Sequence, residues 1–527
     1  MKRGALLVRA DSTVASGTGH VMRCLALAQA WQRGGGNVIF AMSRCALSLR
    51  ERLHRERIEV VDIEAEPGSD DDLRKTVVAV DLHLAHAEWI VVDGYHFRPK
   101  YLSELQKNNR ILLIDDNAEL DFYPADLVLN QNPHARPEMY ANRESRTRML
   151  LGPRYALLRN EFAVCRNWNR RVPTRASKAL LTVGGSDPKN LTPRILSALA
   201  TLPVEELQIR VVVGGSAENL KAVEAAAAEN NDGRIEVLSN VSNMAELMTW
   251  ADLAVAGAGT TCWEMCLLGL PAVLIVVAEN QRRLAEYLST IGAAGACDAE
   301  SLDIASLQQL TCELLANQDR RREMSQAGRQ LVDGLGRERV DAALLNRELH
   351  LRLAQAADCE LVFEWARDPI ARAASFHSSE ISSEEHARWF ADKLQDLNSP
   401  IYIGENSDGE PVGLVRFQIK NDTAVLSVNV AQAYRGEGWG RQLVQFGTSA
   451  LFRARSVCRI HAFVKPGNQA SVRLFEASGF QRAAPQQVAG QDAFLFILEG
   501  NVLEREVMEN EILASKGLEN EKLSHAE

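Results

Sequence analysis

The chain alternates short runs of aliphatic and β-branched residues with longer segments in which apolar residues recur every three or four positions. The short runs typical of buried strands are 5–10, 37–42, 89–94, 110–115, 178–185, 208–215, 234–238, 252–259 and 271–277. Strands that alternate with helical segments indicate parallel sheets covered by helices on both faces. The pattern falters over 131–177, which is polar, arginine-rich and interrupted by prolines. We therefore expect two doubly wound, Rossmann-like α/β halves, 1–150 and 151–340, joined by a linker.

The pattern changes near residue 350. A strand and a helix are followed by 399–406, 411–419 and 423–430, which read as consecutive antiparallel strands with alternating faces. This arrangement predicts a separate α+β domain over 350–498. The amphipathic, charged stretch 318–348 would join it to the α/β halves, and 499–527 would form an acidic, solvated tail.

Composition narrows the class of protein. With 527 residues, 46% of them hydrophobic and 24% charged, the chain is expected to be soluble and to contain several cores. A net charge of −10 has the wrong sign for a protein whose main role is to neutralise nucleic-acid phosphates. We expect no nucleic-acid partner.

Cysteine usage and apolar run lengths bear on the compartment. The nine cysteines are scattered without metal-ligand spacing, as is typical of reduced thiols. The first apolar run, 5–8, is far shorter than a signal-peptide core, and the longest later run, 267–278, contains Gly269 and Pro271. We expect a cytoplasmic protein that neither spans a membrane nor binds one.

A glycine loop follows the first predicted strand and leads into a helix. In the sequence Gly17-Thr18-Gly19-His20, the glycines would let the backbone approach a ligand, and the helix N-terminus would present N–H groups to an anion. A tight turn needs glycine whatever binds there, so the Gly-x-Gly pattern alone leaves a purely structural role open. His20 adds a group that can accept a proton from water near neutral pH.

The second half carries two similar loops. Gly185 and Ser186 follow one strand, and Gly259, Thr260 and Thr261 follow another, where their N–H and hydroxyl groups suit a diphosphate. Glu264 lies one turn into the next helix and suits a pair of ribose hydroxyls. An ordinary first-turn acid favoured by the helix dipole is the alternative for Glu264.

Loops GTGHVMR (17–23) and GAGTTCWE (257–264), with the two-half layout, resemble the two-lobed (GT-B-like) nucleotide-sugar glycosyltransferases. More narrowly, the chain resembles the nucleotide-sugar hydrolase family of pseudaminic acid biosynthesis over roughly 5–300. The segments that carry this resemblance are 9–28, 91–97, 112–116, 126–133, 152–162, 183–191 and 278–281. It implies removal of UDP from UDP-2,4-diacetamido-2,4,6-trideoxy-β-L-altropyranose, which leaves the free sugar.

The resemblance also implies residue roles. His20 would activate or orient the attacking water, and Asn280 would hold that water or the sugar. Tyr95 and Asp93 would line the same cleft as weaker catalytic candidates. The UDP-binding residues would be Gly19, Gly185, Ser186, Gly259, Thr260, Thr261, Glu264 and Gln281.

No metal site is expected. Cys262 and Cys266 lie four residues apart on a helix without further ligands nearby and are better explained as packing residues. Asp115 and Asp116, at a strand end, suit either sugar hydroxyls or a solvated loop.

In the C-terminal domain, the strand 426–430 leads into Arg435-Gly-Glu-Gly-Trp-Gly-Arg441 and a helix. Glycine-flanked N–H groups at a helix start make a pyrophosphate cradle. This loop and the segment 464–480 resemble the acetyl-CoA motifs of the GCN5-related N-acetyltransferase (GNAT) family, which makes acetyl-CoA the expected co-substrate. The implied acetyl-CoA-binding residues are Val428, Val430, Arg435, Gly436, Gly438, Gly440, Arg441, Asn468, Ser471 and Phe475.

One residue departs from the family pattern. Phe475 stands where many members carry a tyrosine that protonates the leaving thiolate, and phenylalanine has no proton to give. Candidates for the base are His377, Glu380, His386 and His461, and the sequence does not choose among them.

Together the two resemblances predict a bifunctional enzyme. The C-terminal domain would N-acetylate the 4-amino group of a UDP-linked 6-deoxy sugar, and the two-lobed part would hydrolyse the product, so that both substrates are UDP-sugars. Consecutive steps on one chain raise the local concentration of the shared intermediate. A UDP-sugar glycosyltransferase, a nucleotide-sugar sensor and an acetyltransferase of other amines are the alternatives, and other enzymes of the pathway are possible partners.

Overall fold

The computed structural model describes residues 3–13, 17–85, 88–185, 187, 189–204, 206–215, 217, 219–230, 233–300, 302–377, 379–455 and 457–500. The chain forms two compact units: Met1–Arg166 with Arg170–Asp341, and Asn167–Asn169 with Ala342–Glu527. The predicted acidic tail lies outside the described residues from 501 onward. Within the described ranges, no helix is long and apolar enough to cross a membrane.

The first lobe of unit 1 is a parallel sheet with strand order β3-β2-β1-β4-β5-β6-β7. Its strands are β1 (Ala5–Ala10), β2 (Asn37–Met42), β3 (Glu59–Asp62), β4 (Trp89–Asp93), β5 (Arg110–Ile114), β6 (Leu127–Asn130) and β7 (Arg148–Leu151). Its helices are α1 (Gly19–Arg33), α2 (Leu47–Arg55), α3 (Asp70–His83), α4 (Pro99–Gln106) and the 3-10 turn η1 (Pro137–Tyr140). β7 falls in the stretch that the sequence predicted to be a linker. The sequence did not reveal this strand, because an edge strand with half-buried residues lacks the apolar run of a central strand.

The second lobe is a parallel sheet with strand order β10-β9-β8-β11-β12-β13. Its strands are β8 (Lys178–Thr182), β9 (Gln208–Val213), β10 (Ile235–Ser239), β11 (Leu253–Gly257), β12 (Ala272–Val276) and β13 (Gly295–Asp298). Its helices are α6 (Leu191–Ala200), α7 (Leu220–Glu229), α8 (Met244–Trp250), α9 (Thr261–Leu268), α10 (Glu279–Thr290), α11 (Ile304–Ala316), α12 (Gln318–Leu331) and α13 (Gly336–Leu344). The connection from the first lobe contains η2 (Pro153–Tyr155) and α5 (Asn160–Ala163).

Two apolar cores explain why these strands form. All five residues of β4 and of β11 are buried, as expected for central strands covered on both faces. One core gathers beneath α3 and α4 and the other beneath α6, α7 and α11. The predicted fold of two Rossmann-like lobes is confirmed.

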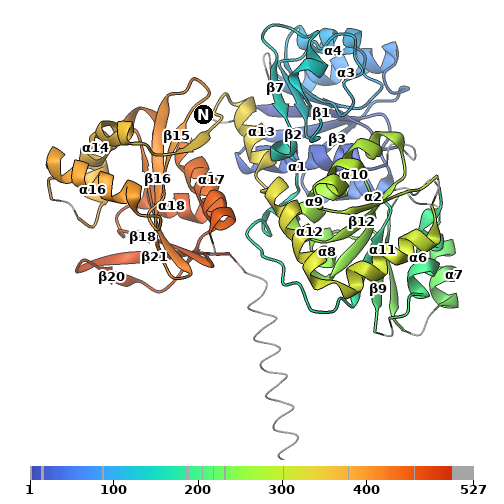
Figure 1. The fold of residues 1–527 in the computed structure, drawn as a ribbon. Coiled ribbons are helices and arrows are strands. Elements are labelled where there is room, and N and C mark those ends of the chain that lie inside the picture. The colour runs from blue at the N-terminus through green and yellow to red at the C-terminus, as the bar shows by residue number, and fades with distance from the viewer. Residues whose placement is uncertain are drawn as a thin grey trace, which may run out of the picture. The chain divides into compact units, whose positions relative to one another are not determined.

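Unit 2 is a mixed sheet with strand order β14-β15-β16-β17-β18-β21-β19, and β20 pairs with β21. Its strands are β14 (His350–Leu353), β15 (Ile401–Glu405), β16 (Pro411–Lys420), β17 (Thr423–Val430), β18 (Arg459–Val464), β19 (Gln481–Arg482), β20 (Gln486–Val488) and β21 (Gln491–Glu499). Its helices are η3 (Ala356–Asp358), α14 (Cys359–Arg367), α15 (Pro369–Ala374), α16 (Ser383–Gln395), η4 (Gln432–Tyr434), α17 (Trp439–Ala454) and α18 (Gln469–Ala477). β17 and β18 are parallel, whereas the other pairs are antiparallel. Figure 1 shows α14 and α16 on one side of this sheet and α17 and α18 on the other, so the predicted α+β domain is confirmed.

Candidate active sites

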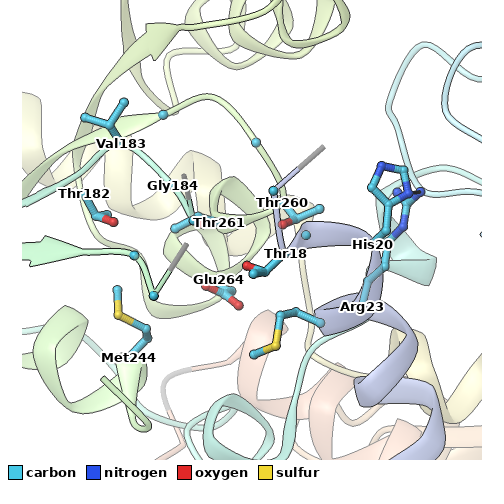
Figure 2. Close-up of a pocket in the computed structure, with 18 of the residues that line it drawn as sticks. Thr18, His20, Arg23, Thr182, Val183, Gly184, Met244, Thr260, Thr261 and Glu264 are labelled. Atoms are coloured by element: carbon cyan, nitrogen blue, oxygen red, sulfur yellow. Dashed lines mark hydrogen bonds between the residues drawn. The ribbon is translucent and has the colours of Figure 1, made fainter. Parts of the chain in front are cut away.

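A cleft of about 660 Å³ in unit 1 is lined by loops that follow parallel strands of both lobes. The N-termini of α1, α9 and α10 all contribute to its lining. The first N–H groups of a helix have no partners within the helix, and the helix dipole places positive potential there. The cleft is therefore built to hold anionic oxygen. Figure 2 shows His20 and Arg23 at one end of it, Met244 at the other, and Thr18, Thr260 and Glu264 between them.

Glycines allow the loops of the two lobes to approach each other closely. A Cβ on Gly185 would lie 2.8 Å from Oγ1 of Thr18, and a Cβ on Gly19 would lie 3.4 Å from Oγ1 of Thr260. The predicted diphosphate residues Gly19, Gly185, Gly259, Thr260 and Thr261 all line the cleft. The expected contact from Ser186 lies outside the described residues.

His20 lies in the first turn of α1, and a buried carboxylate at the end of β4 orients its ring. Nδ1 of His20 lies 2.5 Å from Oδ1 of Asp93. An ionised carboxylate only accepts hydrogen bonds, so Nδ1 carries a proton, and in the neutral ring Nε2 is the nitrogen with the lone pair. The pairing with Asp93 fixes the orientation of the His20 ring, and this ring lines the cleft.

Arg23 forms the second set of hydrogen bonds to Asp93. Its Nε and Nη2 donate to the two carboxylate oxygens of Asp93 at 2.7 Å each. Burial alone would raise the pKa of Asp93, but the charge of Arg23 and the hydrogen bonds from Arg23 and His20 outweigh burial and hold this pKa well below its usual range. Asp93 thus stays ionised and accepts the hydrogen bond from Nδ1 of His20.

A second carboxylate joins this pair to the other lobe. Nη1 of Arg23 donates to both oxygens of Asp116, at 2.9 and 2.8 Å. Asp116 also accepts from Asn132 at 3.0 Å and from the Tyr95 hydroxyl at 3.2 Å, and Nδ2 of Asn280 donates to that hydroxyl at 3.1 Å. The predicted residues His20, Tyr95 and Asn280 therefore line one end of the cleft, whereas Asp93, which was predicted to line it too, is buried behind His20.

Tyr95 is placed as a neutral donor. Its ring meets that of His20 edge to face, with centroids 4.9 Å apart. Burial, followed by the charge of Asp116, raises the pKa of Tyr95 above its usual value. The side chain presents a proton rather than a negative charge beside His20.

Glu264 lines the cleft in the first turn of α9, but it is not a solvated first-turn acid. Oε1 accepts from Nη2 of Arg159 at 2.7 Å, and both side chains are largely buried. Burial raises the pKa of Glu264, and the charge of Arg159 opposes that shift. Oε1 of Gln281 accepts a hydrogen bond from the N–H of Val277 at 3.0 Å. Its Nε2 would lie 3.8 Å from a Cβ on Gly259.

Sequence reasoning missed three parts of this cleft. Arg23 and Arg159 have no motif role of their own, and an arginine is ordinarily a surface residue. The loop 240–242 also lines the cleft, and Met244 lies at the end opposite His20; no chemistry-bearing pattern marks either of them. The GTGHVMR segment contains Arg23 and was the only available signal for it.

In the described ranges, no group of three or more His, Cys, Asp or Glu residues is arranged to hold a metal ion. Cys262 and Cys266 are both buried beneath α12, in agreement with a packing role. Asp115 accepts the backbone N–H groups of Asn117 and Ala118, and burial raises its pKa to about 6. Asp115 therefore shapes its turn, whereas Asp116 faces the cleft.

In unit 2, the glycine loop leads into α17 as expected. Gly436 and Gly438 have φ values of +82° and +97°, which L side chains rarely adopt, and Cβ atoms at these positions would meet open space. A Cβ on Gly440 would lie 3.3 Å from the Val430 side chain, so glycine lets α17 pack closely on β17. A glycine-rich turn of this kind can present backbone N–H groups to an anion.

The two arginines of this loop differ in their partners. Nη2 of Arg435 lies 2.8 Å from Asp368, and Nε of Arg435 donates to the carbonyl of Val430 at 3.0 Å. Arg435 therefore braces the loop against the start of α15. Arg441 lies in the first turn of α17, where its charge adds to the helix N-terminus.

β17 and β18 diverge next to this loop. Their ladder ends at Val425 and His461, although β17 continues to Val430 and β18 to Val464, all within described residues. Val428 and Val430 lie half-buried beside the resulting wedge. Backbone groups that face the wedge are available to an extended, amide-bearing ligand.

The second motif caps and packs α18. Oδ1 of Asn468 accepts the N–H of Ser471 at 3.1 Å, which makes Asn468 the N-cap of the helix. Phe475 is 4% exposed, and its ring centroid lies 5.1 Å from that of Phe480 and 5.9 Å from that of Phe496. Phe475 thus packs in the core on the α18 side of the sheet.

The four base candidates have different surroundings. His386 is 3% exposed and is enclosed by Phe363, Trp389 and Phe390. His377 and Glu380 are exposed between α15 and α16, whereas His461 is half-buried on β18.

Comparisons with known proteins match both units. Residues 179–335 match the glycosyltransferase family 28 C-terminal domain, and 362–480 match the acetyltransferase (GNAT) family. An uncharacterized protein of Methanocaldococcus jannaschii is 22% identical over 90% of this chain and 96% of its own length. The UDP-2,4-diacetamido-2,4,6-trideoxy-beta-L-altropyranose hydrolase of Campylobacter jejuni is 26% identical over 54% of this chain and 97% of its own length. The crystal structure of MurG from Acinetobacter baumannii covers 65% of this chain and 99% of its own, with 20% identity and a TM-score of 0.47.

The chain therefore joins a two-lobed unit, similar to a UDP-sugar hydrolase and to family 28 glycosyltransferases, with a domain that matches the GNAT acetyltransferase family.

Proposed function

We propose that unit 1 hydrolyses UDP-2,4-diacetamido-2,4,6-trideoxy-β-L-altropyranose to UDP and the free sugar, and that unit 2 N-acetylates the UDP-linked 4-amino precursor. One observation supports the first activity most strongly: His20, paired with Asp93, lines the same cleft as the N-termini of three helices. The similarity to the hydrolase of Campylobacter jejuni supplies the sugar.

The N-termini of α1, α9 and α10 would hold the diphosphate, and Glu264 would accept the ribose hydroxyls with the oxygen that Arg159 leaves available. Charge that develops on the leaving phosphate is then met by fixed N–H dipoles, which need no reorganisation during the reaction. The sugar would occupy the end of the cleft near Tyr95 and Asn280.

In the chemical step, Nε2 of His20 takes a proton from water while the water oxygen bonds to C1 of the sugar. The bond from C1 to the phosphate oxygen breaks, and UDP leaves with that electron pair. Asp93 stabilises the imidazolium through Nδ1, and the proton then passes to solvent. Holding the water in place contributes by converting a bimolecular encounter into a positioned attack.

For unit 2, the N–H groups of 436–440 would hold the pyrophosphate of acetyl-CoA, and the wedge beside Val428 and Val430 would hold its pantetheine arm. Acetyl-CoA supplies an acetyl thioester that an amine can attack. Arg435 keeps the loop in shape through Asp368, and Arg441 adds positive charge.

The test is UDP release by the full-length protein from the diacetamido UDP-sugar with no acceptor present. The variant His20→Ala should lose turnover but keep its UDP affinity, whereas His54→Ala, an exposed histidine on α2, should match the wild type. UDP release that is unchanged in His20→Ala would refute the proposed base. A separate assay of CoA thiol release from acetyl-CoA and the UDP-4-amino sugar tests unit 2.

A UDP-sugar glycosyltransferase is the second candidate for unit 1, because the second lobe matches a glycosyltransferase domain. A transferase would release UDP only when a sugar or lipid acceptor is added. A sensor would bind UDP-sugar without any release, so the same assay separates all three functions.

A further inference from the structure

The structure distinguishes among the four candidate bases of unit 2, and the choice follows from which face of the sheet each one occupies. Residues paired directly across a sheet point to the same face, as do residues two apart along a strand. Val425 pairs with His461, and His461 pairs with Ile497. Ser427 and Asn429 continue the same face along β17.

Helices cover this face only in part. Nδ2 of Asn429 donates to the carbonyl of Trp365 at 2.8 Å, so α14 reaches the level of Asn429. Four residues earlier, Val425 is 36% exposed, and Ser427 between them is also exposed. A molecule can therefore reach the sheet at the level of Val425 and His461.

The flanks of this opening are built from two other segments. Nζ of Lys465, just after β18, donates to the carbonyl of Ala373 at 3.0 Å, and Nε2 of Gln491 donates to the carbonyl of Phe376 at 3.1 Å. The end of α15 and the residues after it are thereby tied to the far ends of β18 and β21. His461 lies on β18 at the ladder end, four residues before Lys465 of this tie.

The wedge between β17 and β18 closes at the rung of Val425 and His461. A ligand arm that enters beside the loop 435–440, next to Val430, runs down the wedge toward that rung, about 10–17 Å away at 3.3 Å per residue. Its reactive end therefore comes to lie at the level of His461.

The other candidates do not meet this condition. His386 is sealed among aromatic rings and contacts Cys359, and its buried Nε2 has no partner in the described structure. Phe475 stacks on Phe496, which pairs with Ala462 and so faces the α18 side of the sheet, opposite to His461. His377 and Glu380 are exposed on the segment after α15 rather than on the sheet.

We propose that His461 is the catalytic base of acetyl transfer in unit 2 and takes a proton from the acceptor ammonium, directly or through one water. This inference rests on the proposed acetyltransferase function. The amine left by that proton attacks the thioester carbon, the new C–N bond forms, and the C–S bond breaks. The proton that nitrogen sheds on becoming an amide goes to sulfur through solvent, so the products are the acetamide, CoA thiol and one proton, which His461 returns to solvent.

The surroundings of His461 keep it ready to accept a proton. Burial and then Arg459 lower its pKa, and Glu499 opposes them. Arg459 and Glu499 pair with each other at 3.0 Å. Val425 and Ile497, which pair with His461 on the adjacent strands, and Phe463 on β18 are apolar. A folded pKa below the usual value of 6.5 leaves the imidazole neutral at pH 7, and activity should be lost as pH falls through that pKa.

The experiment compares full-length wild type with His461→Gln and, as a matched control, His350→Gln, an exposed histidine on β14 of the same sheet. The probes are acetyl-CoA with the UDP-4-amino-4,6-dideoxy sugar and, separately, with spermidine as an unrelated amine. CoA release gives kcat and KM against pH, calorimetry gives acetyl-CoA affinity, and NMR of the imidazole gives the titration of His461 without any turnover.

We expect His461→Gln to lower kcat by about 100-fold at pH 7 and to lose the acidic limb of the pH profile, because general-base catalysis contributes roughly 100- to 10,000-fold. Acetyl-CoA affinity should be unchanged, added imidazole should partly restore a His461→Gly variant, and the NMR midpoint should match the limb in the wild type.

A His461→Gln protein with the wild-type rate and pH profile would overturn the assignment while leaving acetyl transfer intact. Equal loss of acetyl-CoA affinity and turnover would also overturn it, because it would show a structural role. A wild type that binds acetyl-CoA and acetylates neither amine would overturn the assignment together with the proposed function of unit 2.

Discussion

Replacement of Asp93 by asparagine tests how His20 is held. Asp93 receives three strong donors on two oxygens: Nδ1 of His20 at 2.5 Å, and Nε and Nη2 of Arg23 at 2.7 Å each. Asparagine offers one accepting oxygen and one donating amide. Whichever way the amide is turned, at least one donor of the wild type faces the amide nitrogen.

The two orientations have different consequences. If the amide nitrogen faces Nε of Arg23, the buried guanidinium loses part of its charge partner. If the amide nitrogen faces His20 instead, Nδ1 must become the acceptor and the proton moves to Nε2. Nε2 can then no longer take a proton from water. The second orientation keeps the hydrogen bond that Nε of Arg23 donates, but it takes the acceptor away from Nη2 of Arg23 and removes the base.

The magnitudes follow from these losses. A lost general base lowers kcat by roughly 100- to 10,000-fold, which corresponds to about 3–5 kcal/mol of barrier. Breaking a buried ion pair costs about 3–5 kcal/mol of stability, and we expect the lower value because Arg23 keeps Asp116. The pKa of Asp93 is lowered on folding, so its contribution to stability is present at neutral pH and lost as pH falls below the ordinary aspartate range.

The assay is UDP release at saturating substrate, with UDP affinity from calorimetry and stability from urea unfolding. Asp116→Asn is the matched control, because it weakens the same arginine without touching His20. It should lose stability to a similar extent but keep much more turnover than Asp93→Asn. An Asp93→Asn enzyme with near-wild-type kcat would refute the reasoning.

The remaining predictions concern the nucleotide, the cofactor loop and pH. Glu264→Gln should weaken UDP binding by about tenfold, because a charge-assisted hydrogen bond to the ribose becomes a neutral one; unchanged affinity in calorimetry would place the ribose elsewhere. Gly438→Ala forces an L residue into φ +97° and should weaken acetyl-CoA binding and cost about 1–2 kcal/mol, whereas Gly467→Ala, with open space at its Cβ, should not; equal effects of the two would contradict a conformational role. Burial raises the pKa of Asp115 to about 6, so stability should fall as pH rises from about 4 to 6, and Asp115→Asn should flatten that part of the profile in urea titrations; a wild-type profile in the variant would show that Asp115 is not the group.

The sequence predicted the longer apolar strands of both lobes and the edge strand β10, but it missed the edge strands β3, β7 and β13 and the short interior strand β6. β4 is wholly buried and reads as an apolar run, whereas β3 has exposed ends around two half-buried residues and β7 is half-buried at three of its four positions. Edge strands derive their order from one neighbour and from the lobe as a whole, which local periodicity does not report. The two lobes and the α+β domain were nevertheless predictable, because their central strands dominate the pattern.

The candidate site divides in a similar way. Glycine loops and His20 are visible because the chemistry requires those residue types next to a strand and a helix. Arg159 is 105 residues away from Glu264, and Arg23 is 70 from Asp93 and 93 from Asp116. Only the packing of whole elements turns these arginines from surface residues into buried partners, so their carboxylate partners could not be assigned from a local pattern.

The central claim is that water, positioned by His20, attacks the sugar carbon of a UDP-sugar held in the cleft. Its most direct test is turnover of the diacetamido UDP-sugar in ¹⁸O-labelled water without acceptor, followed by mass spectrometry of both products. The account predicts unlabelled UDP, labelled free sugar, and neither product from the His20→Ala variant. Label in the UDP phosphate, or UDP release that requires an added acceptor, would contradict it.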